Sequence, residues 1–285
     1  MAAVELELCW GTARGAALPE LLDVAGAAGY RSVAVRPSMY YDARSDGFGD
    51  GELRARMDDA GVVVGVVDPL TAGLPGVPAA ASVPPAMRAF VSYGEDDCCA
   101  VAEALGAPVV NVAHFLGTPQ PAGLLADAIG ALAERAAARG LRVALEFIPG
   151  TGIPDLPSAL ALCREVGTGT VGIMFDTWHF YRSGGTVDEL GQLPPGVVFG
   201  CQVSDASPAA LEPGYVPMTD RLLPGRGTLP LPAVLAALVG NNPDLRIGVE
   251  VFRNDLRRMG PDRAARTVAD AMGPILDAMA GAADG

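Results

Sequence analysis

The chain has 285 residues, and 33 acidic residues against 20 basic ones give it a formal net charge of −13. Every basic residue is an arginine, so the sequence excludes a Schiff-base lysine, lysine-bound pyridoxal phosphate and a phosphate-binding P-loop lysine. The acidic balance and the absence of an apolar run of about 18 residues argue against an extended nucleic-acid surface and against a membrane span.

Short runs of apolar, mostly β-branched residues alternate with longer helical patterns along the whole chain. The eight predicted strands cover residues 6–10, 32–36, 62–67, 108–115, 142–148, 171–175, 197–203 and 246–252. Their almost continuous hydrophobicity is typical of strands that are covered on both faces, as in a parallel sheet. Strands that alternate regularly with helices indicate βα units.

The clearest helical pattern spans residues 121–139, and another closes the chain at 263–279. Gly61, Gly106, Gly140 and Gly167 each stand just before a predicted strand and are expected to end the preceding helices. We therefore predict one (β/α)8 TIM barrel domain over residues 1–285. An open doubly wound sheet is the alternative, but the Gly-x-Gly-x-x-Gly turn that such a sheet uses after its first strand is missing.

Two predicted loops are long and contain several prolines, at residues 68–86 and 204–228. Active sites of barrels lie at the carboxyl ends of the strands, so long loops that follow strands usually build or cover the site. The alternative is that the prolines only stiffen surface connections.

Four polar side chains stand at the carboxyl ends of predicted strands five to eight, namely Glu146, Asp176, Gln202 and Glu250. The first three are each about one βα unit apart, so we expect them on neighbouring strands at the same height. A buried carboxylate is costly unless it is paired or binds a cation. Oxygen donors suit Mn²⁺ or Mg²⁺, with Co²⁺ or Zn²⁺ as other occupants, so these four residues are predicted metal ligands. For Gln202 the alternative is a packed, hydrogen-bonded residue.

Several segments together resemble the xylose-isomerase-like superfamily of barrels, namely 145–147 (Leu-Glu-Phe), 175–179 (Phe-Asp-Thr-Trp-His), 198–205, 223–227 (Leu-Pro-Gly-Arg-Gly) and 249–251 (Val-Glu-Val). The group that looks most similar is that of the sugar phosphate isomerases and epimerases, and the resemblance covers essentially the whole chain. It implies a divalent metal held by the same four side chains. Many members carry histidine at the position of Gln202, whereas the hydroxypyruvate isomerases resemble this chain in using glutamine.

The resemblance also implies substrate-binding residues around the predicted site. His179 lies where the epimerases carry a histidine that touches substrate, next to Trp178, and Arg221 lies where the family commonly sets an arginine against substrate oxygens. His114 at the end of the fourth strand and Arg36 just past the second are further candidates at the predicted mouth. The alternatives are packed structural histidines and solvated arginines.

The leading hypothesis is a divalent-metal-dependent sugar isomerase or epimerase. The metal would chelate a ketone oxygen and a neighbouring hydroxyl, while Glu146 and Glu250 exchange a proton at the adjacent carbon through an enediolate. One alternative is a dehydratase of the inosose or 3-dehydroshikimate type, with His179 as the acid that releases a hydroxyl. Another is a barrel that binds sugar without catalysis.

The expected partner is a small carbohydrate or keto acid, rather than nucleic acid or a membrane. A homo-oligomer would agree with the dimers and tetramers that are common in the family. Five cysteines without a Cys-x-x-Cys motif, and an amino terminus without a signal-peptide pattern, lead us to expect a cytoplasmic protein.

Overall fold

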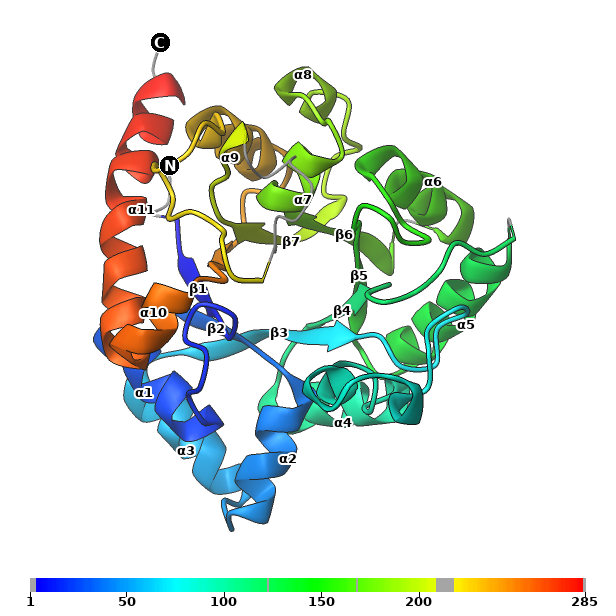
Figure 1. Ribbon diagram of the computed structural model, residues 1–285, viewed down its shortest axis with the longest axis horizontal. Coiled ribbons are helices and arrows are strands. Elements are labelled where there is room, and N and C mark those ends of the chain that lie inside the picture. The colour runs from blue at the N-terminus through cyan, green and yellow to red at the C-terminus, as the bar shows by residue number, and fades with distance from the viewer. Residues whose placement is uncertain (1–3, 122, 168, 209–217, 284–285) are drawn as a thin grey trace.

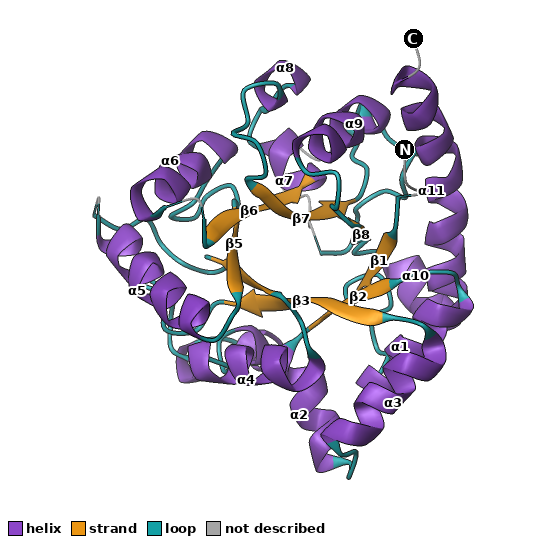
Figure 2. Ribbon diagram, turned by 180° about the vertical axis from the view of Figure 1, so that it is seen from behind, coloured by secondary structure: helices purple, strands orange, loops and turns teal. Residues whose placement is uncertain are grey.

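The computed structural model describes residues 4–121, 123–167, 169–208 and 218–283. Its parallel strands close into a barrel in the order in which they occur along the chain, surrounded by a ring of helices (Figures 1 and 2). The strands are β1 (Leu6–Cys9), β2 (Ser32–Val35), β3 (Val63–Leu70), β4 (Val109–Ala113), β5 (Arg142–Glu146), β6 (Val171–Asp176), β7 (Val198–Val203) and β8 (Ile247–Val249). Pairing of β1 with β8 closes the barrel, so the predicted (β/α)8 fold is confirmed.

The helices connect these strands on the outside of the barrel. They are α1 (Leu18–Ala27), α2 (Pro37–Ser45), α3 (Asp50–Ala60), α4 (Glu95–Leu105), α5 (Leu124–Ala138), α6 (Leu156–Val166), α7 (Thr177–Arg182), α8 (Val187–Leu190), α9 (Leu231–Asn241), α10 (Asn254–Met259) and α11 (Pro261–Ala283), with short 3₁₀ helices at Ala80–Ser82 and Pro85–Phe90. Gly61 and Gly106 end α3 and α4 in the left-handed conformation, as predicted from their positions. Within the described residues, no helix combines the length and apolar character needed to cross a bilayer.

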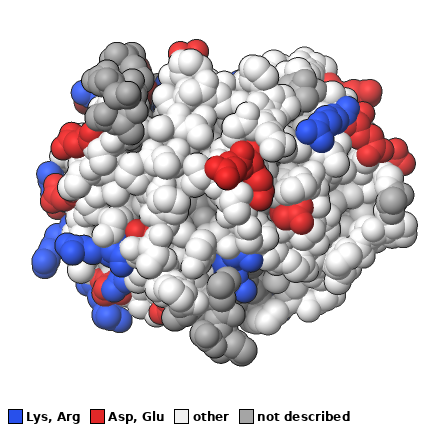
Figure 3. All heavy atoms as spheres, turned by 90° about the horizontal axis from the view of Figure 1, so that it is seen from above, with Lys and Arg blue, Asp and Glu red and all other residues white. Residues whose placement is uncertain are grey.

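Charged side chains lie mainly on the outer surface. On the face shown in Figure 3, acidic and basic residues are interspersed among wide uncharged areas. The ion pair between Arg135 and Glu95, at 2.6 Å, lies at the protein surface, and pairs of this kind contribute little to stability.

Side chains along each strand alternate between the inside of the barrel and the helices around it. Inside, one apolar layer combines residues from six strands: Cys9, Ala34, Val66, Val109, Ala144 and Met174. Outward positions such as Val110, Leu145 and Phe175 belong to the larger core between strands and helices. The barrel is therefore filled by side chains at this level, and any ligand must bind above it.

A polar layer lies beyond the apolar one, and its side chains also point into the barrel: on β3 to β6 each member stands two residues past an apolar-layer residue of the same strand, and Gln202 and Glu250 continue the layer at β7 and just after β8. It consists of Asp68, Asn111, Glu146, Asp176, Gln202 and Glu250, each at most 6% exposed. Gln202 stands two residues past Gly200, where an added Cβ would come within 2.4 Å of Met174 Cε, so glycine leaves the room that Met174 occupies. The alternation of side chains along the strands thus places the polar layer directly above the apolar layer.

The heights of the predicted metal ligands follow the stagger of the barrel strands. Asp176 lies directly opposite Gln202, as expected from the sequence. Glu146 instead lies opposite Met174, two residues before Asp176, and Gln202 lies opposite Gly248, two residues before Glu250. Because the strands of a closed barrel are tilted and staggered, residues that are two positions apart in register can still lie in one layer, and ligand atoms of Glu146 and Asp176 lie within 4.8 Å of each other.

The long connection after β7 is fastened at its base by Asp205, which is 1% exposed. Its carboxylate accepts hydrogen bonds from the backbone N–H groups of Ala206 at 2.8 Å, Gly227 at 2.8 Å and Leu229 at 3.1 Å. Its backbone pairs with that of Leu222. Asp205 therefore holds together the start and end of the connection that carries Arg221.

We predict that Asp205→Ala destabilises the protein by about 3 kcal/mol, because it leaves three backbone N–H groups without their buried acceptor. The matched control is Asp155→Ala, which removes a single hydrogen bond to the Ser158 N–H at the start of α6 and should cost about 1 kcal/mol. Urea unfolding measures both free energies. Equal losses in the two variants would contradict the role given to Asp205.

Candidate functional site

A cavity of about 370 Å³ opens at the carboxyl ends of the strands. Its charged and amide-bearing lining consists of Asp68, Glu146, His179, Arg182, Gln202, Arg221 and Glu250. Its apolar walls include Trp10, Phe90, Phe115, Leu116, Ile148, Trp178, Met218 and Phe252. A polar base with aromatic walls is the usual form of a site that takes a small molecule.

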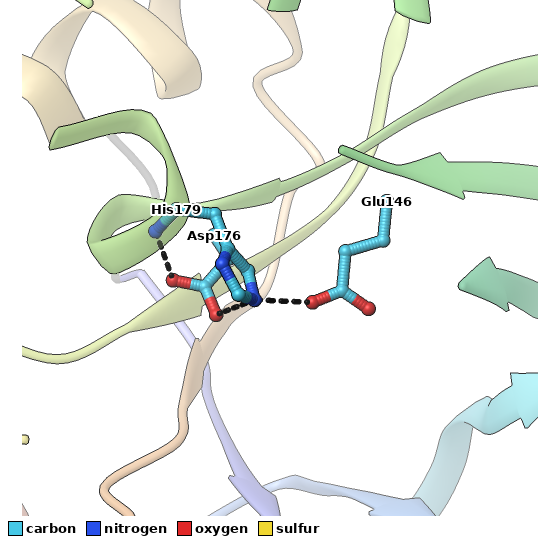
Figure 4. A group of neighbouring side chains, drawn as sticks. All are labelled: Glu146, Asp176 and His179. Atoms are coloured by element: carbon cyan, nitrogen blue, oxygen red, sulfur yellow. Dashed lines mark hydrogen bonds and ion pairs between the residues drawn. The ribbon is translucent and has the colours of Figure 1, made fainter. Parts of the chain in front are cut away.

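Asp176 and His179 meet because helix α7 begins directly at the end of strand β6. Asp176 Oδ1 caps this helix by accepting hydrogen bonds from the N–H groups of Trp178 at 2.6 Å and His179 at 3.3 Å. His179 Nε2 then lies 3.6 Å from the other oxygen, Asp176 Oδ2, and 3.4 Å from Glu146 Oε1 (Figure 4). Glu146, Asp176 and His179 each offer one potential ligand atom, and these atoms lie within 4.8 Å of one another.

Arg221 reaches into the same group and is 3% exposed. Its Nη1 donates to Asp176 Oδ2 at 2.6 Å and to Glu250 Oε2 at 3.4 Å, while Nη2 lies 3.5 Å from His179 Nε2. The guanidinium carbon lies 5.1 Å from the centre of the Trp178 ring. The structure thus brings together Glu146, Asp176, His179, Arg221 and Glu250, all of which the sequence placed in the site.

Buried negative charge exceeds buried positive charge in this group. Burial and the nearby carboxylates of Asp68, Asp176 and Glu146 raise the pKa of Glu250 well above its ordinary value, although Arg221 acts to lower it. Burial also acts to raise the pKa of Asp176, but Arg221 and His179 outweigh it and lower that pKa. One arginine therefore stabilises the ionised form of Asp176, while the pKa of Glu250 shows the excess of negative charge.

Asp68 is a site residue that the sequence analysis missed. Burial, followed by the charge of Glu146, raises its pKa from 3.8 to about 7, although hydrogen bonds from Asn111 and Trp10 act against the rise. The prediction ended the third strand at residue 67 and assigned Asp68 to a loop, whereas β3 continues to Leu70. The rule that found Glu146, a carboxylate after an apolar strand, would have found Asp68 as well.

The oxygen groups of this site fit a divalent cation. Gln202 Oε1 is buried, and no described residue donates a hydrogen bond to it. It lies on the strand position opposite Asp176, in a group whose negative charge Arg221 does not balance. An amide oxygen and several carboxylates are ligands that Mg²⁺ and Mn²⁺ accept, and His179 Nε2 adds a nitrogen donor that zinc also accepts.

The structure places His114 outside the cavity lining. It shares the outward face of Val110 and Val112, because alternate residues of a strand point the same way. Its Nδ1 accepts the N–H of Gly152 at 2.9 Å, and its Nε2 lies 2.7 Å from the carbonyl oxygen of Pro75. His114 therefore ties the loops after β3 and β5 together, and the sequence prediction overlooked the direction in which it points.

Arg36 and Trp178 lie differently with respect to the cavity. The Arg36 guanidinium carbon lies 4.5 Å from the centre of the Trp10 ring and 5.9 Å from that of Phe90, behind residues that line the cavity. Arg36 is not among the lining residues itself. Trp178 does line the cavity and is 2% exposed. The structure therefore brings Trp178 to the site and sets Arg36 behind its aromatic wall.

We predict that the metal-free protein becomes less stable as the pH rises from about 4 to about 7. The pKa of Asp68 is about 7 in the folded protein, above the ordinary 3.8, so the folded state retains a proton that the unfolded state has released. Glu250 acts in the same direction, whereas the lowered pKa of Asp176 costs stability only when the pH falls below about 4. Asp68 alone contributes a slope of at most about 1.4 kcal/mol per pH unit.

Urea unfolding in the presence of a chelator, at several pH values, measures this slope. Asp68→Asn should flatten it, and Asp127→Asn, at an exposed position on α5, should leave it unchanged. An equally steep loss of stability in the Asp68 variant would show that Asp68 does not carry the proton.

Two relatives match about half of this chain. An inosose isomerase of Bacillus velezensis is 27% identical over 144 residues, which cover 50% of this chain and 51% of that protein. A 3-dehydroshikimate dehydratase of Pseudomonas aeruginosa is 33% identical over 153 residues, which cover 53% of this chain and 24% of that protein. The matches thus span about half of the first relative and about a quarter of the second.

A solved structure of the IOLI protein with a bound zinc atom has the same fold as this chain. The TM-score is 0.79 at 19% sequence identity, and the alignment covers 96% of this chain and 98% of that one. The family model described as the xylose isomerase-like TIM barrel matches residues 22–275. The chain belongs to the family of xylose isomerase-like TIM barrels.

Proposed function

We propose that this protein is a divalent-metal-dependent isomerase or epimerase that moves a proton beside the carbonyl of a small carbohydrate or keto acid. The observation that carries the proposal is the pair of buried glutamates, Glu146 and Glu250, which line one cavity with Gln202 and lie around Asp176 and Arg221. The family and the inosose isomerase relative support the reaction class.

Glu146, Asp176, Gln202 and Glu250 would hold the metal, because each contributes a buried oxygen donor to the polar layer. When bound, a divalent cation would polarise the substrate carbonyl and stabilise the negative charge that develops on its oxygen. The oxygen donors favour Mn²⁺ or Mg²⁺, whereas the zinc atom of the IOLI protein and the nearby His179 nitrogen support Zn²⁺ as an alternative.

Glu146 and Glu250 are the proposed proton acceptor and donor. Asn111 Nδ2 donates to Glu146 Oε2 at 2.9 Å, so Oε1 remains on the side of His179. Glu250 is held from the other side by Arg221 Nη1. Each carboxylate is thus fixed through one oxygen, and an oriented carboxylate can take a proton from a carbon held beside it and return it elsewhere.

His179, Arg221 and Trp178 are the proposed substrate contacts. His179 and the guanidinium of Arg221 can donate hydrogen bonds to substrate oxygens, and the Trp178 ring can cover an apolar face of a sugar or cyclitol. The aromatic walls make the surroundings of the polar groups less polar, which strengthens electrostatic interactions within the cavity. A cavity of about 370 Å³ limits the substrate to a small molecule.

A dehydratase is the second candidate, favoured by the position of His179. Its Nε2 lies 3.4 Å from Glu146 Oε1, so an acid could stand next to the base that removes the proton. The same proton removal would then be followed by loss of a hydroxyl group. The 3-dehydroshikimate dehydratase relative supports this class. Absorbance of a conjugated product distinguishes a dehydratase from an isomerase, which forms no new C=C bond in its product.

We predict that Glu146→Gln and Glu250→Gln each slow the reaction by roughly 10²–10⁴-fold, because an amide cannot accept the proton. The measurement is incorporation of solvent deuterium at carbon, with saturating Mn²⁺ and a panel of ketoses and inososes as substrates. Glu134→Gln, at an exposed position on α5, is the control and should retain wild-type exchange. Full exchange in either site variant with metal bound would contradict its role.

We also predict that removal of divalent metal with a chelator abolishes exchange and lowers the melting temperature, and that added Mn²⁺ restores both. A metal concentration 100 times the dissociation constant stabilises a protein by about 2.7 kcal/mol. Calorimetry with and without Mn²⁺ measures the effect. Unchanged activity and melting temperature after complete metal removal would reject a metal-dependent reaction.

A further inference from the structure

We propose that Asp68 is a positioning residue that selects which end of the Gln202 amide faces the metal site and, through Asn111, fixes the orientation of Glu146. The inference rests on the metal site of the proposed function. It concerns a residue that the sequence analysis did not assign to the site. Asp68 comes from β3 and Gln202 from β7, so the contact between them crosses the interior of the barrel.

Asp68 is surrounded by hydrogen-bond donors and is 3% exposed. Its Oδ2 accepts hydrogen bonds from Trp10 Nε1 at 3.0 Å and from Gln202 Nε2 at 3.2 Å. Its Oδ1 accepts a hydrogen bond from Asn111 Nδ2 at 2.6 Å. Three donors from three different strands or strand ends therefore converge on one carboxylate.

These contacts determine the orientation of the Gln202 amide. A primary amide has a donor end and an acceptor end of nearly the same shape, so packing alone does not distinguish them. The ionised carboxylate of Asp68 only accepts hydrogen bonds, so it selects the NH₂ end of the amide. The oxygen of Gln202 must then point away from Asp68, and it receives no hydrogen bond from any residue in the described ranges. Its lone pairs remain available on the residue that is paired in strand register with Asp176.

The same carboxylate orients Glu146 through a second amide. Asn111 Nδ2 donates one hydrogen bond to Asp68 Oδ1 and another, at 2.9 Å, to Glu146 Oε2. Because Asp68 fixes the amide orientation of Asn111, Glu146 presents its other oxygen toward His179 Nε2, at 3.4 Å. Asp68 thus controls two proposed metal ligands on different strands without being one of them.

This arrangement explains why the buried carboxylate of Asp68 lies next to Gln202, a neutral proposed metal ligand. A glutamine that turned its NH₂ group toward a cation would repel it, because the NH₂ hydrogens carry positive charge. Partners of metal ligands that fix their orientation commonly change metal affinity by roughly 10–100-fold when they are replaced. Asp68 would therefore act on the metal by excluding the unproductive orientation of Gln202.

The test compares Mn²⁺ binding by the full chain and its variants, measured by isothermal titration at a pH above 7, where Asp68 is ionised. Asp68→Asn should weaken binding by about 10-fold or more, because its NH₂ group can pair with Gln202 Oε1 and turn that oxygen away from the site. Glu7→Gln is the matched control. Glu7 is also a buried barrel carboxylate, 5% exposed and hydrogen-bonded to Ser32 Oγ at 2.6 Å, but it lies on β1 near the opposite end of the barrel. This control should bind Mn²⁺ like the wild type.

A charge-conserving exchange separates orientation from general support of the fold. In Gln202→Glu, two carboxylates face each other, whereas in the double variant Asp68→Asn/Gln202→Glu the amide introduced at position 68 can donate to the new carboxylate and leave its second oxygen for Mn²⁺. Asp68→Asn should therefore weaken binding when residue 202 is glutamine and leave it unchanged or strengthen it when residue 202 is glutamate. A purely structural or long-range electrostatic role would give the same loss in both backgrounds.

Wild-type affinity in Asp68→Asn, or an equal loss in both backgrounds, would overturn the inference and leave the proposed function intact. If Asp68→Asn does not fold, the comparison of Gln202→Glu with the double variant decides, and weaker binding by the double variant overturns the inference. Failure of the wild-type protein to bind Mn²⁺ would instead reject the metal site of the proposed function, and this inference with it.

Discussion

The concentration of buried negative charge at the carboxyl end of the barrel is the constraint around which the site is organised. Asp68, Glu146, Asp176 and Glu250 are each at most 6% exposed, and Arg221 is the arginine that contacts two of them. Buried charges of one sign are unfavourable unless they are paired, protonated or bound to a cation. The structure uses pairing at Asp176, and the raised pKa values of Asp68 and Glu250 show where pairing is insufficient. A bound cation would offset the buried negative charge that Arg221 does not balance.

Much of this arrangement could be predicted from the sequence because barrel strands are short, apolar and regularly spaced. The strand-end rule located Glu146, Asp176, Gln202 and Glu250, and their side chains do lie in one polar layer. It could not show the hydrogen bond between Gln202 and Asp68, because that contact joins residues on strands β7 and β3, far apart in the chain. Contacts across a barrel depend on its closure and stagger, which local patterns do not encode.

Two errors of the sequence analysis have the same physical origin, namely the period of two along a strand. His114 was placed at the mouth because it follows an apolar run, but it shares the outward direction of Val112 and binds loop backbone. Asn111, one of the inward positions of the same strand, was overlooked although it is the one amide within that apolar run. Counting in steps of two from Val109 would have reversed both assignments.

The two carboxylate oxygens of Asp176 make different contacts, and this limits which substitutions the site can accept. One oxygen caps α7 and the other contacts Arg221. A substitution that altered the chemistry at this position would also disturb the first turn of the helix that carries Trp178 and His179. By contrast, the Gln202 amide donates to the Asp68 side chain inside the barrel and does not cap α7. An exchange at position 202 would therefore leave the start of α7 intact, whereas an exchange at position 176 would alter a proposed metal ligand and a helix cap together.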